Sequence, residues 1–520
     1  MSGYWSCVRL LARTGWTSLL AGPLVLVALL AVPAGQMVDR YPTPASRAVY
    51  AAAYEGVNGI ASFQGRGYEL TRLGGMLANE MGFLSLVLFP VAGVLLAIRH
   101  TREIEDTGQL DILTAGRIGR VSPLAAGATV VALSALLTAA LSTVMLLALG
   151  YPARGSLLYA FALALFLLTF SGIGLVTGQL AQTAPQAYGL AFAVFLVIYL
   201  LRAVLDVRHR GGTWSNPESW LAEVRPFSDQ LIVWPWIAYL VSIVVLTAIA
   251  MRIAGHRDLG AGVLVPRPGP NRAPVWASSP AGLLFRLTRG TALAWLIGSG
   301  VFAFAFGLLG NDMADVVRGA RPEEATTALD TLVALFAQIN ALFAGALGVQ
   351  SVTAWSREER SGRLGLMLST AVDRRWFWIC AAAVTLCWPL LTLAWTGLLT
   401  GVGLRFGLRD VSALGEGLTA TLAYTPAVLF VTAFALLLVS ITPAAAPIGW
   451  ILVVWGLVVV FLGNPLGLSQ GLRNISPFEW SGQPPLEAWA QLPALATAVA
   501  AVVGLLLSTA VFGRRELTNG

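Results

Sequence analysis

Apolar runs of membrane-spanning length recur along the whole chain, and polar stretches separate them. The runs are rich in Leu, Ala and Val and do not alternate with polar residues as barrel strands do. A run of about twenty apolar residues crosses a bilayer as an α-helix, because a helix pairs its own backbone polar groups. We predict twelve spans, at Trp16–Ala34, Met81–Ile98, Ala125–Leu149, Leu157–Val176, Ala187–Leu205, Leu231–Met251, Thr291–Leu309, Thr331–Val349, Trp378–Leu399, Leu418–Leu438, Ala446–Leu462 and Leu492–Phe512.

The composition supports this prediction. Of the 520 residues, 57% are hydrophobic and only 11% are charged, and the mean hydropathy is +0.75. A soluble protein does not cover its surface with so few charges. We therefore predict an all-α integral membrane protein of about twelve transmembrane helices, in contact with membrane lipid.

Two charged segments occupy matching places after the second and eighth spans. The first lies near 100–120 and the second near 356–376, and pairing Gly108 with Gly362 gives an offset of 254 residues. Both are predicted as short cytoplasmic helices. Duplication indicates a pseudo-symmetric transport protein whose polar copies contact something outside the bilayer, whereas a single charged loop is more often simply solvated. The candidate contact residues are Arg102, Glu103, Glu105, Asp106, Gly108, Leu110, Arg357, Glu358, Glu359, Gly362 and Leu364.

A basic, proline-rich stretch over 256–280 predicts a cytoplasmic linker between a six-span half at 1–255 and a second at 281–520. Proline at this density disfavours both helix and strand. A second repeated motif supports the duplication: Pro226-Phe227 precedes the sixth span and Pro477-Phe478 precedes the twelfth, at an offset of 251 residues.

All 33 basic side chains are arginine, because the sequence contains no lysine. A phosphate-binding P-loop needs a lysine that reaches the β- and γ-phosphates. The chain therefore lacks this ATPase site. If ATP drives the protein, a partner subunit must hydrolyse it. Arginine-only usage with abundant Ala, Val and Gly is typical of a GC-rich bacterium.

The arginine distribution predicts the orientation. With both termini cytoplasmic, 19 of the 33 arginines fall on the inside. This predicts a multi-pass protein of the bacterial plasma membrane. The three cysteines and three histidines form no ligand spacing, and we predict neither a metal site nor a nucleic-acid partner.

Aromatic and weakly polar residues within the spans are candidates for a cargo cavity. Such a cavity suits a hydrophobic or amphipathic small molecule, although each aromatic residue taken alone is more often a packing residue. The candidates are Phe83, Phe89, Phe192, Phe195, Tyr199, Phe336, Asn340, Phe343 and Trp450.

The charged segments resemble a known family. Their pattern of Arg, paired acids, Gly and Leu after the second span is similar to the ABC-2 type permeases of actinobacteria, and more narrowly to the fused two-half permeases described as exporters of polyketide antibiotics, such as tetronasin-type transport proteins. Arg202 with Asp206 at the end of the fifth span also matches. The sequence departs from the family at Asp111 and Gly365, where a Glu is usual.

This resemblance implies a type V exporter-like fold and a permease subunit without an enzymatic site of its own. It implies two copies of a separate ABC ATPase, which bind ATP and Mg, seated on two coupling helices, and a role in multidrug efflux and antibiotic resistance. Glu105 and Glu359 would accept hydrogen bonds from ATPase Arg or Lys groups. Gly108 and Gly362 would permit a turn or a close approach, and Arg102 and Arg357 would pair with partner acids or lipid phosphates.

Two other classes of protein remain open. An ion-coupled secondary transporter also has twelve spans in two halves, but few acids lie deep in these spans to carry protons. A membrane enzyme is less favoured because no cluster of His, Asp and Glu lies within the spans or at one face. A neighbouring ATPase reading frame would favour the ATP-driven exporter.

Overall fold

The computed structural model describes residues 3–54, 64–108, 118–207, 212–258, 260–264, 274, 279–320, 327–370, 372–408, 412–463 and 466–516. All regular secondary structure in these ranges is helical, and they contain 12 segments long and apolar enough to cross a membrane. Each predicted apolar run overlaps one of these segments. The prediction of an all-α membrane protein with about twelve spans is therefore confirmed.

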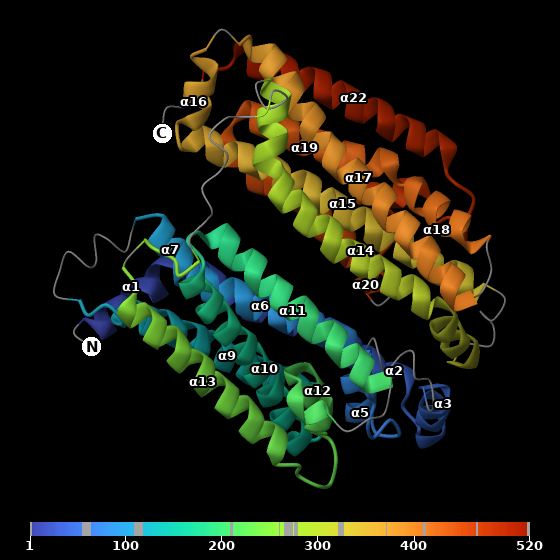
Figure 1. The fold of residues 1–520 in the computed structure, drawn as a ribbon. Coiled ribbons are helices and arrows are strands. Elements are labelled where there is room, and N and C mark those ends of the chain that lie inside the picture. Colours follow the sequence, from blue (N-terminus) through green and yellow to red (C-terminus); the bar gives the residue numbers. More distant parts are fainter. Residues whose placement is uncertain are drawn as a thin grey trace. The chain divides into compact units, whose positions relative to one another are not determined.

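The chain divides into two compact units, Met1–Pro268 and Gly269–Gly520 (Figure 1). The division falls inside the stretch predicted as a linker. Each unit contains six of the candidate spans and is described by itself.

Unit 1 is built around α10, whose most apolar window is 83% buried. This helix contacts α6, α9, α11 and α13. The helices of unit 1 are α1 (Tyr4–Thr14), α2 (Trp16–Arg40), α3 (Pro44–Tyr54), α5 (Leu73–Glu80), α6 (Gly82–Arg99), α7 (Arg102–Asp106), α9 (Ser122–Ala148), α10 (Ala153–Leu180), α11 (Ala184–Val207), α12 (Pro217–Glu223) and α13 (Trp234–His256).

Unit 2 is built around α15, whose apolar window is 89% buried. The tenth candidate span joins α18 to α19, and the eleventh joins the short helix η4 (Pro443–Ile448) to α20. The other helices of unit 2 are α14 (Pro280–Ala320), α15 (Ala328–Arg360), α16 (Arg363–Leu368), α17 (Arg374–Leu408), α18 (Ala413–Leu422), α19 (Thr425–Ile441), α20 (Gly449–Leu462), α21 (Gln470–Arg473) and α22 (Gln491–Arg514).

The same helix pairings occur inside both units. The first span packs on the third (α2 on α9, and α14 on α17), and the second packs on the fourth (α6 on α10, and α15 on α19). The fourth packs on the sixth (α10 on α13, and α19 on α22). These shared pairings place the end of the second span near the end of the sixth span in each unit.

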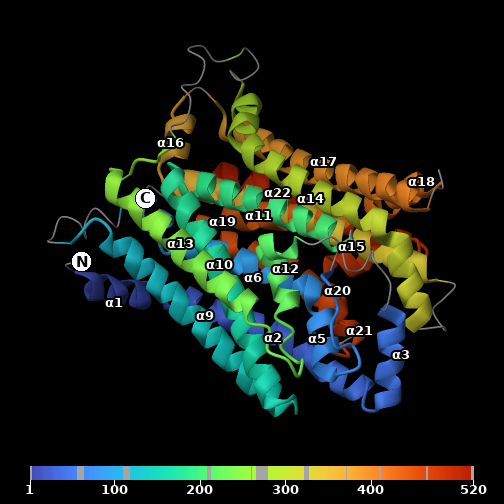
Figure 2. The same cartoon turned by 60° about the horizontal axis from the view of Figure 1, so that its bottom comes forward.

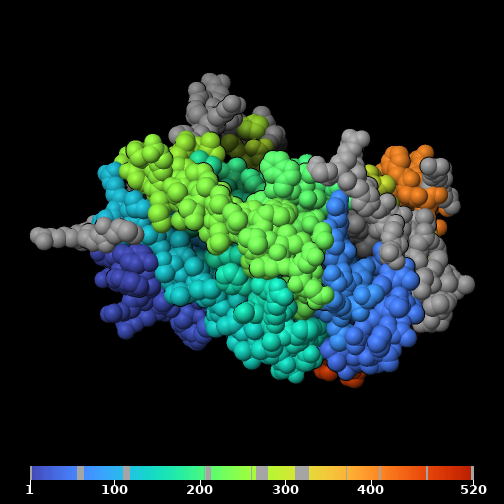
Figure 3. Space-filling model, turned by 90° about the horizontal axis from the view of Figure 1, so that it is seen from below, coloured from blue at the N-terminus to red at the C-terminus, as the bar shows by residue number. Residues whose placement is uncertain are grey.

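Apolar side chains cover the outward faces of several spans, as expected of helices that face lipid. In α13 only 11% of the apolar window is buried within the protein, and Figure 3 shows this helix (green) along one face of unit 1. Its exposed residues include Ile237, Leu240, Val241, Val244 and Val245. The amphipathic α1 instead lies beside α9 (Figure 2). It buries Cys7, Val8 and Leu11 against that helix.

The charged segment of unit 1 forms a separate short helix, as we predicted, whereas that of unit 2 begins within a long helix. In unit 2 the charged residues Arg357–Arg360 form the last turn of α15, which contains no proline and ends two residues before the left-handed Gly362. In unit 1 the helix α7 has only 5 residues and follows α6 after a break at His100 and Thr101. Leu110 lies outside the described residues.

Candidate functional site

Two glycine turns of nearly identical geometry follow α7 and α15 within the charged segments. Gly108 has a φ of 73° and Gly362 a φ of 74°, and their N–H groups donate to the carbonyl oxygens of Glu105 (3.0 Å) and Glu359 (2.9 Å). Glycine adopts this left-handed conformation without the steric cost of a Cβ. A Cβ at either position would meet open space, so the backbone conformation, and not a close approach, accounts for glycine here.

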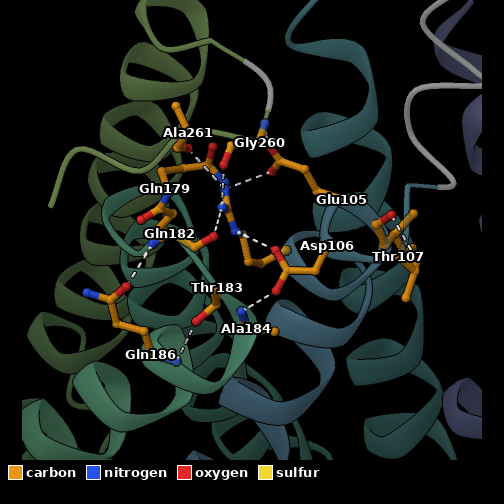
Figure 4. Close-up of polar contacts among 12 residues, drawn as sticks. Glu105, Asp106, Thr107, Gln179, Gln182, Thr183, Ala184, Gln186, Gly260 and Ala261 are labelled. Atoms are coloured by element: carbon orange, nitrogen blue, oxygen red, sulfur yellow. Dashed lines mark hydrogen bonds and ion pairs between the residues drawn. The ribbon is translucent and has the colours of Figure 1, made fainter. Parts of the chain in front are cut away.

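In unit 1 the carboxylate of Glu105 binds the guanidinium of Arg257, which follows the last residue of α13. Two parallel contacts of 2.7 and 2.5 Å join them. The Gly260 N–H donates to the same carboxylate at 2.7 Å, and Figure 4 shows Glu105 beside Gly260. Gln179 accepts from Arg257 Nε at 2.8 Å. A bidentate pair of this kind fixes both distance and orientation, so it joins the end of the second span to the end of the sixth.

Arg102 is fully buried beside this pair. Its guanidinium lies 3.1 Å from Glu105 and 3.2 Å from Asp106, and it donates to the carbonyl oxygens of Gln182, Gly260 and Ala261. Asp106 in turn accepts from the Ala184 N–H at the start of α11, as Figure 4 shows. An acidic group at a helix N-terminus satisfies an unpaired donor and suits the helix dipole. Arg102 therefore organises the contact between α7 and the loop that joins α10 to α11.

Unit 2 repeats the pair with different neighbours. Arg515 follows the last residue of α22, and its Nη2 lies 2.7 Å from both carboxylate oxygens of Glu359. In each unit, therefore, an arginine directly after the sixth span binds the glutamate three residues before the glycine turn. We name Glu105–Arg257 latch 1 and Glu359–Arg515 latch 2.

The counterpart of Arg102 in unit 2 is Ser356, at the same offset of 254 residues. Its buried Oγ donates to the carbonyl oxygen of Pro443 at 2.7 Å, and Arg360 donates to the same oxygen at 3.0 Å. Both units thus tie the end of the second span to backbone carbonyl groups at or just before the start of the fifth span, through an arginine in unit 1 and through a hydroxyl and an arginine in unit 2.

The predicted contact residues divide into buried and exposed groups. Arg102, Glu105 and Glu359 are engaged within the chain, and Leu364 is buried in the core of unit 2. Glu103 and Arg357 are exposed. Glu358 is partly exposed and binds the exposed Arg363 at 2.7 Å. The exposed charges are the ones that a partner protein can reach.

The candidate cargo residues lie within the packing of their own units and line neither of the two cavities described below. Asn340 is buried and donates to Thr400 of α17 at 3.0 Å. Aromatic neighbours hold several of the others: Phe195 packs on Phe170, Phe336 on Phe306, and Phe343 on Phe302. Phe89 is buried, whereas Phe83, Phe192, Tyr199 and Trp450 are partly buried.

Two cavities of about 40 Å³ each lie in unit 1. The inner cavity borders latch 1, between α1, α7 and the end of α13; its lining includes His100, Glu105, Arg120 and Arg257. The second, which we name the outer cavity, lies toward α5 and α12, and its lining includes Arg66, Asp206, Glu218 and Arg225. Figure 1 shows α7 and α12 at opposite ends of unit 1.

A buried ion network that sequence reasoning found only in part adjoins the outer cavity. Arg202, which is fully buried, lies 3.0 Å from Asp206 and 3.3 Å from Glu218. Burial raises the pKa of Glu218 to about 8, against the opposing effect of Arg202. Two acids thus share one arginine, and burial favours the protonated form of Glu218. The spacing of Arg202 and Asp206 on one helix was visible in the sequence, but nothing there signalled Glu218.

These features define an all-helical membrane protein with twelve candidate spans, arranged in two units that each carry a latch at the end of the second span. The chain is similar to the multidrug efflux system permease protein Rv1217c of Mycobacterium tuberculosis (strain ATCC 25618 / H37Rv), with 29% identity over 473 residues that cover 89% of this chain and 85% of that protein. Residues 278–513 match the family described as "Multidrug efflux system permease Rv1217c, C-terminal domain".

Proposed function

We propose that this chain is the membrane-spanning permease subunit of an ATP-driven efflux system that moves hydrophobic or amphipathic compounds out of the cell. The similarity to a multidrug efflux permease over 89% of the chain supports the permease role. The absence of lysine excludes a P-loop in this chain. The hydrolysis of ATP therefore takes place on a separate subunit, of which two copies dock on the two charged segments.

The repeated latch carries this proposal. In each unit the charged segment contains the same glycine turn and is fixed by an ion pair to the arginine after the sixth span, through two guanidinium nitrogens in unit 1 and through one in unit 2. A rigid connection of this kind transmits a displacement of the segment to the second and sixth spans of the unit together. The exposed charges Glu103, Arg357 and Glu358 supply the contact with the ATPase, and the buried latch residues transmit its motion.

This division of roles changes the part assigned to Glu105 and Glu359. Because both carboxylates are buried in ion pairs with arginines of the same chain, they act as transmitting residues. The ATPase recognises the exposed acids instead, through charge-assisted hydrogen bonds. The segments differ in their exposed charges, so two identical ATPase subunits would meet them asymmetrically.

Reversal of the exposed charges tests the docking role. Glu103→Arg combined with Glu358→Arg is expected to reduce the amount of ATPase that copurifies from native membranes by at least about tenfold, since each reversal replaces attraction with repulsion. The amount of ATPase is measured by quantitative immunoblot or mass spectrometry of the purified complex.

The matched control reverses one exposed acid in each unit away from the charged segments, as Asp39→Arg with Glu416→Arg. The control should retain the ATPase at the level of the unmodified chain. If both double variants retain it equally, the exposed acids do not form the docking surface.

A further inference from the structure

The outer cavity has the size and chemistry of a site for a small polar group. Its volume is about 40 Å³, and a single water needs roughly 10–15 Å³ on this scale. The space therefore admits a group of about three heavy atoms, which is the size of a carboxylate. Its lining comes mainly from the residues before α5, from α5 and α12, and from the turn after α12, and α6, α10 and α11 contribute further residues.

Arg66 presents a loosely paired binding edge in this cavity, since its nearest acidic oxygen is that of Asp206 at 3.8 Å from Nε. Its side chain is 23% exposed, yet Nε and Nη2 are buried and make no hydrogen bond within the described part of the chain. These two N–H groups form the side-on fork with which arginine binds a carboxylate in two parallel hydrogen bonds. Arg225, which stacks over the Tyr68 ring at 3.8 Å, also has a buried Nε without a hydrogen bond among the described residues.

Two almost fully buried side chains add further donors. Ser219 is 3% exposed, and its Oγ lacks a hydrogen-bond partner in the described ranges. Glu218 is 1% exposed; Arg202 Nε lies 3.3 Å from one of its carboxyl oxygens, and neither oxygen accepts a hydrogen bond in the described ranges. Burial raises the pKa of Glu218 to about 8, which favours the protonated form, and that form offers an O–H donor. Buried polar groups without partners are costly, and an oxyanion would satisfy these donors together.

We propose that the outer cavity binds the carboxylate head group of an amphipathic molecule, held by the Arg66 fork and the Ser219 hydroxyl. The apolar lining residues Leu86, Leu221 and Phe227 contact the first carbons of its chain. Asp206 opposes the anion, because it lies 3.8 Å from Arg66 Nε, but Arg202 already neutralises it at 3.0 Å. The role of this cavity as a cargo site rests on the proposed efflux function. The binding of a carboxylate does not depend on that function.

Binding of decanoate tests this assignment without ATP or an ATPase subunit. The full-length chain in lipid nanodiscs is equilibrated with radiolabelled decanoate, and saturable binding is compared between variants in the same lipid, which cancels partition into the bilayer. We expect Arg66→Gln to weaken binding by at least about tenfold and Ser219→Ala by about fivefold, as loss of a charged fork and of one neutral hydrogen bond predicts. Arg66→Lys should restore only part of the affinity, because an ammonium keeps the charge but not the fork.

Arg72→Gln is the matched control, since the fork of this arginine is already occupied by Asp229 at 2.9 and 2.6 Å. It should bind decanoate as the unmodified chain does. Decanol should compete at least about tenfold more weakly than decanoate. If acetate competes as well as decanoate does, the oxyanion site stands and its occupant is a small free acid. Equal competition by decanol, or unchanged binding by a folded Arg66→Gln chain, would overturn the proposal.

Discussion

Exchange of the two partners of latch 2, as Glu359→Arg with Arg515→Glu, is expected to recover the efflux activity that either single replacement removes. A single replacement brings two like charges together where Glu359 is 3% and Arg515 14% exposed. Loss of one partner from a buried ion pair costs about 3–5 kcal/mol. We therefore expect each single variant to lose at least about tenfold in efflux rate, and the double variant to regain most of it. The measurement is the initial rate of efflux at equal amounts of protein in the membrane.

Latch 1 supplies the matched comparison. Glu105 also binds the Gly260 N–H at 2.7 Å, and it lies 3.1 Å from Arg102. An arginine at position 105 would face Arg102, so the exchange Glu105→Arg with Arg257→Glu should stay inactive. Recovery in latch 1 and not in latch 2 would contradict the arrangement described here, as would a folded latch 2 exchange with no more activity than the single variants.

Replacement of Arg102 by methionine is expected to cause the largest loss of stability. The variant keeps much of the side-chain volume but leaves Asp106 and three backbone carbonyl oxygens without the guanidinium that they share. Removal of one side of such a network costs about 3–5 kcal/mol. For a unit of this size this corresponds to a decrease in Tm on the order of 10 °C. The measurement is thermal unfolding of the purified chain in one detergent.

The equivalent position in unit 2 gives the control for Arg102. Ser356→Ala removes one neutral hydrogen bond, to Pro443 at 2.7 Å, which is worth about 1 kcal/mol. Its Tm should decrease by only a few degrees. If Arg102→Met and Ser356→Ala unfold at the same temperature, the network around Arg102 does not stabilise unit 1 as we infer.

The spans and the turns were predictable from the sequence because their signals are local. Twelve apolar runs define the spans, and the repeated spacing from Glu105 to Gly108 and from Glu359 to Gly362 marks the two turns. A glycine at the end of a charged helical turn is a sufficient signal for a left-handed residue. The predicted bounds of the charged helices were less accurate. In unit 2 no helix-breaking residue precedes Gly362, so the charged residues belong to the last turn of α15.

The partners of the glutamates were not predictable in the same way. Arg257 lies 152 residues from Glu105, and Arg515 lies 156 residues from Glu359. Only the packing of the second, fourth and sixth spans brings them together. A usable signal did exist, since both arginines directly follow the last turn of the sixth span of their half. Glu218 gave no such signal, because its burial depends on how α12 folds against α11 and α13.

The composition of the complex in native membranes tests the central claim most directly. The chain is purified under mild conditions from its native membranes, and the intact complex is weighed by native mass spectrometry. We expect one chain of 54.9 kDa with two copies of an ATPase subunit that contains a P-loop, and ATP hydrolysis by the purified complex. A chain that carries no ATPase even after cross-linking, and whose cargo moves in vesicles with an imposed proton gradient and no ATP, would contradict the proposal and identify an ion-coupled transporter.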